Sequence, residues 1–568
     1  MHYAELRAVR EELTGPGGQF EIAEVEALGR RLRGFKNAPP SIREFWLSTA
    51  AWGDRPYLAY EDEVLTYSQA HAHAAAIAAW MWERGVRPGD RIALAMRNFP
   101  EWMVIYWAAT SIGVAVAGLN AWWTAEEMDQ ALRDAQPKVL FADRERLARF
   151  RECPGFEAVT LVGVRLDDYP ADVIPYAQVT AHDGALPAVT VDPDSDACIF
   201  YTSGTTGFPK GAQLTHRGCI ANLMNMLYST VAQAQAVERA TGVAPPADPP
   251  VPVTILTTPL FHVTANNCGA YLTSAAGGMM VLMYKWDAGE ALKLIERYKA
   301  TGLSGVPVMA RELINHPDFA KTDTSSLLGL SGGGAQLPPD LVLKIESAVK
   351  TARPTTGYGM TETCGIITSV SGDFFVDRPD SAGPSMPSFE VKVVDDDGRE
   401  LPQGSVGELW VKGTPVIKGY LNRPDATSET ITECGWLHTG DVARIDEDGF
   451  IYIVDRKKDL VIRGGENISC TEVEACIYRL SGVAECCVFG VPDQRLGEEI
   501  GVAVVMKPGE SATAEAVIAH CAEHMSKHKV PRYVWFMDQP LPRNASGKFL
   551  RRELRDELSK QVTEQTNG

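Results

Sequence analysis

A glycine-rich segment constrains the fold more than any other feature of the chain: Tyr201-Thr-Ser-Gly-Thr-Thr-Gly-Phe-Pro-Lys-Gly211. The apolar run Ala197–Tyr201 predicts a strand before it, and a second strand and a helix that Thr215 can cap are predicted after it. Glycines let the backbone approach a ligand closely, and hydroxyl groups and Lys210 supply donors to an anion. Lys210 lies between Pro209 and Gly211, whereas a Walker A loop has Gly before its lysine and Ser or Thr after it. The segment therefore predicts a polyphosphate-binding turn of another kind.

Helical periodicity alternates with short β-branched runs over much of the chain before Asp455. The pattern predicts helices at Gln69–Arg84 and Ala288–Tyr298 and a strand at Ile92–Met96. Such alternation is typical of an α/β fold with largely parallel sheets. From Glu390 to Ile453, strands divided by Gly and Asp turns predict a small antiparallel barrel, and a compact α+β segment is expected after Asp455.

Two other stretches need an interpretation of their own. Residues Trp102 to Trp123 carry no charge and are long enough to span a bilayer, but Gly113 and Gly118 interrupt them. We interpret them as a buried helix followed by a buried parallel strand, and predict no membrane span. Five prolines between Ala244 and Pro252 predict a loop, which we expect to shield or trim the entrance of a binding pocket.

The composition limits the possible partners. The formal net charge is −19, which excludes non-specific nucleic-acid binding, because that needs Lys and Arg against phosphate. The acidic excess lies before Asp455, and the last fifth of the chain is nearly balanced, which suggests two domains. The charged start lacks the apolar core of a secretory signal, and the eleven cysteines show no paired spacing. We expect reduced thiols in the cytoplasm, and leave a homodimer open.

Five motifs in a fixed order give the chain a family resemblance. After the glycine-rich segment come Tyr358-Gly-Met-Thr-Glu362, Gly435-Trp-Leu-His-Thr-Gly-Asp441, Asp455-Arg-Lys-Lys-Asp459 and Pro542-Arg-Asn-Ala-Ser-Gly-Lys548. Singly, most are weak: Asp441 would pass for a turn residue and Lys548 for a loop lysine. In this order they resemble the acyl-adenylating superfamily of acyl-CoA synthetases, peptide-synthetase adenylation domains and beetle luciferases.

The resemblance implies a role for each matching residue. Thr361, Glu362 and Lys548 would be catalytic: Thr361 bonds the α-phosphate, Glu362 binds Mg²⁺, and Lys548 bridges the carboxylate and the α-phosphate. Tyr358 would stack on adenine, Asp441 would accept the ribose hydroxyls, and Arg456 would also reach the ribose. The remaining predicted nucleotide-binding residues are Thr202, Ser203, Gly204, Thr205, Thr206, Gly207 and Lys210 in the phosphate loop, and Gly333, Gly334 and Ala335 beside adenine.

The resemblance also implies a division of the chain. It predicts a large domain over residues 1–454, a hinge at 455–458 centred on Lys458, and a small mobile domain over 459–568. That domain would turn after adenylation and withdraw Lys548. CoA would then pass Arg463, Gly464, Gly465 and Glu466, although this segment is equally compatible with a plain β-turn.

The predicted reaction is ATP-dependent ligation of a carboxylic acid to CoA through an acyl-AMP. ATP and CoA are the expected co-substrates, and Mg²⁺ is the expected cofactor. His262 disfavours an amino-acid substrate, because amino-acid-activating relatives place an Asp there. Small or apolar residues at the predicted acyl site favour a fatty or aryl acid: Val263, Val306, Gly332, Gly357 and Met360. The alternatives are an enzyme that loads a carrier-protein thiol and a silent relative that binds acyl nucleotides.

Overall fold

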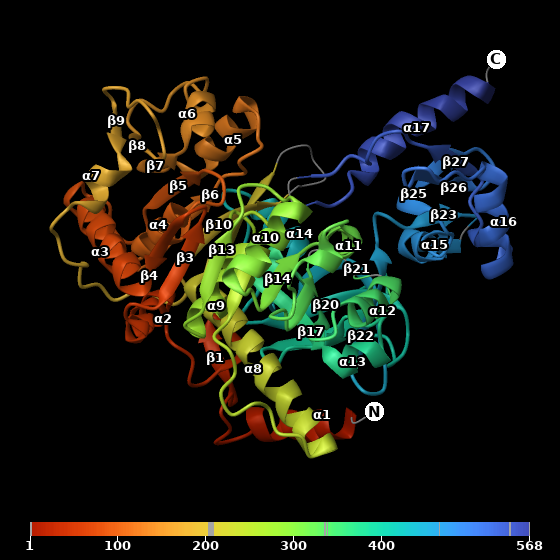
Figure 1. Cartoon of the computed structure of the whole chain (residues 1–568), viewed down its shortest axis with the longest axis horizontal. Helices are drawn as coiled ribbons and strands as arrows, with labels where there is room; N and C mark the ends of the chain where they lie inside the picture. Colours follow the sequence, from red (N-terminus) through yellow and green to blue (C-terminus); the bar gives the residue numbers. More distant parts are fainter. Residues whose placement is uncertain are drawn as a thin grey trace.

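The computed structural model describes residues 3–202, 209–333, 337, 339–464, 466–544 and 547–566. Three sheets build the large part of the molecule, and a smaller part (blue in Figure 1) follows them in the chain and lies to one side. The predicted α/β architecture with a small C-terminal α+β domain is confirmed.

The first sheet has seven strands in the order β11-β10-β6-β5-β7-β8-β9, parallel except for the β10–β11 pair. Its inner strands are apolar on both faces, as expected for strands covered by helices on each side. The strands are β5 (Arg91–Ala95), β6 (Ala115–Gly118), β7 (Val139–Ala142), β8 (Thr160–Gly163), β9 (Val173–Pro175), β10 (Asp196–Thr202) and β11 (Lys210–Thr215). The helices between them are α4 (Pro100–Thr110), α5 (Ala125–Ala135), α6 (Arg144–Phe150) and α7 (Tyr176–Thr180).

The second sheet has eight strands in the order β17-β16-β15-β14-β12-β13-β3-β4 and is parallel except at its two edges. Its strands are β3 (Pro56–Tyr60), β4 (Glu63–Thr66), β12 (Val253–Leu256), β13 (Met279–Leu282), β14 (Gly302–Gly305), β15 (Gly329–Gly332), β16 (Arg353–Met360) and β17 (Gly365–Ser371). The accompanying helices are α3 (Tyr67–Glu83), α8 (His216–Thr241), α9 (Tyr271–Ala275), α10 (Ala288–Tyr298), α11 (Pro307–Asn315), α12 (Pro339–Ala348) and α13 (Gly372–Asp377). Helix α8 begins where predicted, with Thr215 capping the backbone N–H of Gly218.

The region predicted as a small antiparallel barrel from Glu390 to Ile453 is a five-stranded sheet in the order β18-β22-β21-β20-β19. It begins earlier, at Gly383, and among the described residues its edge strands β18 and β19 do not pair with each other. Its elements are β18 (Gly383–Pro384), β19 (Phe389–Val394), β20 (Gly407–Gly413), α14 (Pro424–Thr430), β21 (Leu437–Ile445) and β22 (Phe450–Arg456). The amino-terminal elements are α1 (Tyr3–Thr14), the hairpin β1 (Ile22–Ala27) and β2 (Arg30–Phe35), and α2 (Ile42–Ser48).

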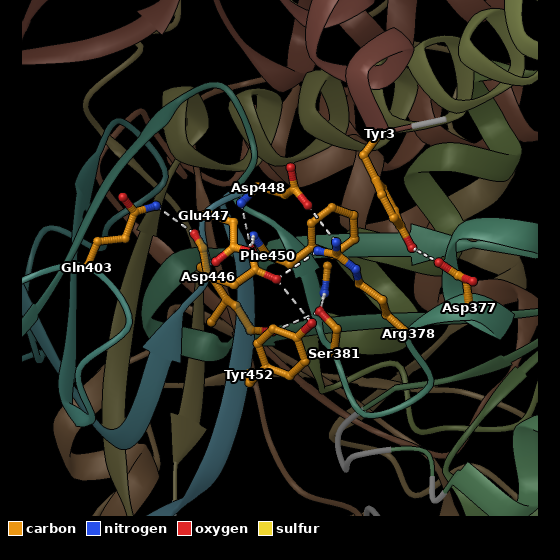
Figure 2. Close-up of polar contacts among 12 residues, drawn as sticks. Tyr3, Asp377, Arg378, Ser381, Gln403, Asp446, Glu447, Asp448, Phe450 and Tyr452 are labelled. Carbon is orange, nitrogen blue, oxygen red and sulfur yellow. Dashed lines mark hydrogen bonds and ion pairs between the residues drawn. The ribbon is translucent and has the colours of Figure 1, made fainter. Parts of the chain in front are cut away.

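Helix α1 is fastened to this third sheet at its first residue (Figure 2). The ring of Tyr3 meets Phe450 edge to face at 5.1 Å, and the Tyr3 hydroxyl donates to Asp377. The Arg378 guanidinium lies 4.0 Å from the centroid of the Tyr3 ring and pairs with Asp446 at 2.7 Å and Asp448 at 2.5 Å. These aromatic and charged contacts anchor the start of α1 to the third sheet and to the end of α13. Helix α1 also packs on α8, beside which it lies in Figure 1.

The small part has its own apolar cores. One gathers Val461, Val473, Val488 and Val502, and a second forms around Phe489, Leu541 and Leu558, all of which follow the last residue of the large core, Ile451. Its elements are β23 (Val461–Arg463), β24 (Glu466–Ile468), α15 (Cys470–Ile477), β25 (Val483–Asp493), β26 (Gly497–Met506), α16 (Ala514–His524), β27 (Tyr533–Phe536) and α17 (Arg551–Thr566).

The charge-free run Trp102–Trp123 is confirmed as buried globular structure. It forms most of α4 and then β6, and Trp102 and Trp107 are fully buried. Among the described residues, no helix is long and apolar enough to cross a membrane. The predicted helix at Ala288–Tyr298 is found with those bounds, and the helix expected at Gln69–Arg84 runs over Tyr67–Glu83.

Candidate active site

A cavity of about 1360 Å³ lies between the large sheets and the small domain. One end is polar, with Thr202, Lys210, Glu362, Arg456 and Lys548 among its lining residues. The other end continues along α8. The cavity thus has a charged end that suits a phosphate chain, and it continues from there as a channel along α8.

Asp441 is the centre of a buried hydrogen-bond network beside this charged end. Its side chain is 4% exposed; Oδ2 accepts from the Tyr358 hydroxyl at 2.6 Å, and Oδ1 from Nε of Arg456 at 3.1 Å. Burial raises the pKa of Asp441, and the Arg456 charge opposes that rise. The backbone is fixed as well, because Thr439 Oγ1 accepts from the Asp441 N–H and donates to the Leu409 carbonyl. Residues from three separate motifs thus meet at one carboxylate.

Glu362 is held in a tight turn between β16 and β17. A single turn of 3₁₀-helix, Thr361–Thr363, ends at Cys364, which adopts a left-handed conformation with φ 54°. Any side chain at Gly359 would collide with the Gly365 carbonyl, so glycine is required where the strands bulge together. Tyr420 donates to Oε1 of Glu362 at 2.7 Å, which fixes the buried carboxylate at the cavity wall.

Lys210 begins the strand that returns from the phosphate loop. It pairs with Thr202 in the β10–β11 ladder, so these two residues bracket the predicted loop. The Lys210 ammonium lies 5.4 Å from the centroid of the Tyr420 ring, which places it near Glu362. The other predicted loop residues, Ser203, Gly204, Thr205, Thr206 and Gly207, lie outside the described residues, as do Gly334 and Ala335. Gly333 lines the cavity.

Lys548 reaches the cavity from the small domain. Its side chain keeps an exposed surface, but the protein packed around it desolvates the ammonium group and, with the nearby Arg456 charge, lowers the pKa of that group to about 8. Burial and the charge of Lys548 likewise lower the pKa of His262 to about 4, so His262 is neutral at pH 7. The lysine of the last motif therefore lies close to the residue predicted to mark the acyl carboxylate.

The channel contains most of the predicted acyl-site residues. His262, Val263, Val306, Gly357 and Met360 line the cavity, while Gly332 ends β15 one residue before Gly333. Sequence reasoning missed the contribution of α8, whose lining residues are Met226, Ser229, Thr230, Gln233, Ala234 and Val237. These residues recur every three or four positions, as residues on one helix face do. That spacing is the sequence signal that could have indicated a wall formed by α8.

The proline-rich loop lies at the far end of the channel. Val243, Ala244, Pro245 and Pro246 line the cavity there, next to the last turns of α8. Val243 is 69% exposed, so this end of the channel opens to solvent.

The predicted CoA segment forms the β23–β24 hairpin. Within the described part of the chain it contributes no lining residue to the cavity. Arg463 forms a bidentate pair with the buried Glu499, at 2.6 and 3.1 Å. Gly464 has φ 61°, Glu466 is exposed, and Gly465 lies outside the described residues. The predicted hinge residue, Lys458, lines the cavity.

Comparison with known proteins agrees with this geometry. Residues 45–421 match the AMP-binding enzyme family, and residues 472–548 match the AMP-binding enzyme C-terminal domain. The chain is 35% identical to feruloyl-CoA synthase of Amycolatopsis sp, covering 86% of this chain and 93% of that protein. It is 32% identical to long-chain-fatty-acid–CoA ligase of Escherichia coli, covering 91% and 94%. Among solved structures, ATP-bound MatB from Rhodopseudomonas palustris is 29% identical, with a TM-score of 0.78 over 90% of this chain and 98% of that one.

The chain belongs to the AMP-binding enzyme family. Within that family it is an acyl-CoA ligase, so the reaction class predicted from the five ordered motifs is confirmed.

Proposed function

We propose that the chain ligates a fatty or aryl carboxylic acid to CoA through an acyl-AMP. The observation that carries this proposal is the continuity of the cavity from the cationic pole at Lys210 and Lys548 to the channel along α8. Such a shape accepts a triphosphate and a carboxylate at one end and a long or bulky acid tail at the other. Feruloyl-CoA synthase and long-chain-fatty-acid–CoA ligase, with an aryl and a fatty acid in their names, are among the relatives.

In the first half-reaction a carboxylate oxygen attacks the α-phosphorus of ATP, and pyrophosphate leaves. Two anions must meet, so preorganised positive charge and hydrogen-bond donors dominate the catalysis. In our assignment Lys548 bridges the carboxylate and the α-phosphate, Thr361 bonds the α-phosphate, and Lys210 and the loop after Thr202 hold the outer phosphates. Asp441 and Arg456 bind the ribose, and Tyr358 packs on adenine next to Gly333.

Glu362 is the residue that we assign to Mg²⁺. Its chemistry suits this ion, because Mg²⁺ prefers hard oxygen ligands. The Glu362 carboxylate is buried at the cavity wall beside the predicted phosphate site, and one of its oxygens accepts from the Tyr420 hydroxyl. Magnesium would neutralise the phosphate charge there.

In the second half-reaction a thiolate displaces AMP from the acyl-AMP. We propose that the small domain, residues 459–568, turns about the 455–458 hinge at Lys458 between the two steps. The turn would carry Lys548 away and bring Arg463, Gly464, Gly465 and Glu466 to the cavity as the wall of a CoA passage. The separate apolar cores on either side of the hinge support such a movement.

CoA is the proposed acceptor, and a carrier-protein thiol is the alternative. The named ligases and synthases among the relatives favour CoA. The eleven free thiols support a reducing, cytoplasmic location.

A panel of short, medium and long fatty acids and aryl acids, with ATP, Mg²⁺ and CoA, tests the proposal. We expect pyrophosphate release that depends on the acid, and free acyl-CoA detected by mass spectrometry. Release of pyrophosphate without acyl-CoA would favour the carrier-protein alternative. A flat rate across all chain lengths would contradict a role for the channel in selecting the acid.

A further inference from the structure

A second cavity, of about 160 Å³, lies beside the acyl channel and beneath helix α1. Apolar side chains such as Tyr3, Leu6 and Phe450 line it together with the charged residues Arg7, Arg10 and Asp448. By volume it is large enough for a ring or a branch of an acyl chain, since a cavity of about 150 Å³ can hold a benzene molecule.

Gln233 separates the two cavities. Three described residues line both of them, Ser229, Gln233 and Ser369, and Gln233 has the longest side chain of the three. It lies on the α8 face that forms the channel wall. The channel itself continues past Gln233 to Val237 and the proline-rich loop. Gln233 is therefore a side wall of the channel rather than its end.

The amide of Gln233 is held by four hydrogen bonds. Nε2 donates to the Ser229 carbonyl at 3.2 Å and to Ser229 Oγ at 2.8 Å. Oε1 accepts from the Ser371 N–H at 2.8 Å and from Ser371 Oγ at 3.0 Å. A glutamine amide offers two donor hydrogens and two acceptor lone pairs, and all four are used. The side chain thus forms a fixed bridge from α8 to the end of β17, because turning it aside would break four bonds.

The wall that α1 gives to the second cavity is anchored as well. Phe374 of α13 lines the acyl channel, and its ring lies 5.9 Å from that of Tyr3 in α1. Tyr3 is anchored in turn to Asp377 and Phe450, as Figure 2 shows. The second cavity therefore lies between two rigid supports, with the Gln233 bridge on the channel side.

We infer that Gln233 is a specificity-determining residue, which sets the width of the acyl channel by closing it off from the cavity beneath α1. The bridge makes no hydrogen bond available to the acid, so it acts by steric exclusion. Acids with a slender tail pass along it, and acids with a bulky group at its level are rejected. This inference rests on the proposed function, because it requires that the acid occupies the channel along α8.

The test compares the wild type with Gln233→Ala, which joins the two cavities. The substrates are two series of acids of matched chain length, linear saturated acids and their ω-phenyl counterparts, assayed by acid-dependent pyrophosphate release. For the chain length that brings the phenyl ring to residue 233, we expect the ratio of kcat/KM for the ω-phenyl acid to that for the linear acid to rise at least about tenfold in Gln233→Ala. We expect kcat/KM for the linear acids to change by less than about threefold.

Gln235→Ala is the matched control: it removes the same side chain from the same helix at a position that lines neither cavity. It should keep the wild-type ratio at every chain length. If Gln233→Ala does not fold, Gln233→Ser replaces it, since a serine hydroxyl can still bond the Ser229 carbonyl while leaving the passage open.

The outcomes separate the two hypotheses. An active wild type with an unchanged ratio in the folded Gln233 variant overturns the role of Gln233 and leaves the proposed function intact. A wild type that releases pyrophosphate with no acid at all overturns the proposed function, and this inference with it. An equal rise in Gln235→Ala would show a general loosening of α8 and would also overturn it.

Discussion

Gly547 of the small domain packs directly on Val306 of the large one. A Cβ placed on Gly547 would lie 2.8 Å from Cγ2 of Val306, and Gly547 has φ +80°. The residue before Lys548 therefore touches the wall of the acyl channel. A second contact joins the domains nearby, where the Arg311 guanidinium lies 5.1 Å from the centroid of the Tyr478 ring.

Gly547→Ala is expected to impair adenylation selectively. The added methyl group would clash with Val306 and would add backbone strain of about 1–3 kcal/mol. The loop that carries Lys548 should therefore no longer pack closely against the large domain. We expect the rate of acyl-AMP formation to fall at least about tenfold, which corresponds to about 1.4 kcal/mol. Gly509→Ala is the control: Gly509 has φ +82° in the same domain but open space around it. Equal losses in both variants would assign the effect to strain alone.

Lys548→Ala should separate the two half-reactions. If the lysine acts only in adenylation, the variant loses acyl-AMP formation by at least about 100-fold, because a charge that stabilises the transition state is removed. Thioester formation from chemically prepared acyl-AMP and CoA should stay within about threefold of the wild type. Lys507→Ala, which removes an exposed lysine of the same domain, serves as the control. Equal loss of both half-reactions would refute the alternation of domains.

The pH profile should report the lowered pKa of Lys548. A lysine with an ordinary pKa of about 10.4 stays charged throughout the neutral range, whereas this ammonium group loses its proton as the pH rises through about 8. Since the charged form is the one that binds the phosphate, kcat/KM for ATP in adenylation should fall on the alkaline side with a midpoint near 8. Lys548→Arg keeps its charge, so its lower activity should not show this alkaline limb. A wild-type profile that is flat to pH 10 would contradict the assignment.

Glu362→Gln should weaken the dependence on magnesium. Replacing the carboxylate with an amide removes the proposed charged ligand, and we expect adenylation to fall about 100-fold and the Mg²⁺ concentration for half-maximal rate to rise. Tyr420→Phe keeps the carboxylate but removes the hydrogen bond that fixes it, which costs about 1.5–3 kcal/mol for a charged acceptor. Its effect on the rate should be smaller, about tenfold. An unchanged magnesium dependence in Glu362→Gln would exclude the ligand role.

The sequence predicted the reaction class, and five ordered motifs pointed to residues that the fold gathers at the polar end of the cavity, among them Lys210, Glu362 and Lys548; their assignment to the nucleotide stays a prediction. It did not predict the partners that hold those residues. Tyr420 bonds Glu362 from 58 positions away, and only the folded chain brings them together. Likewise, the periodicity of α8 shows that one face is covered but not that the face forms a channel wall. The four bonds of Gln233 depend on where β17 ends, which no local pattern reveals.

The division of the apolar core after Ile451 has a consequence for unfolding. The two apolar cores of the small domain consist wholly of residues after Val454, so each domain has an apolar core of its own. Regions that share a packed core unfold together, and these two domains have separate cores. We therefore expect heat to unfold the molecule in two separate transitions rather than one. A saturating nucleotide should raise the unfolding temperature of the large domain more than that of the small domain, since the large domain supplies most of the residues at the polar end of the cavity.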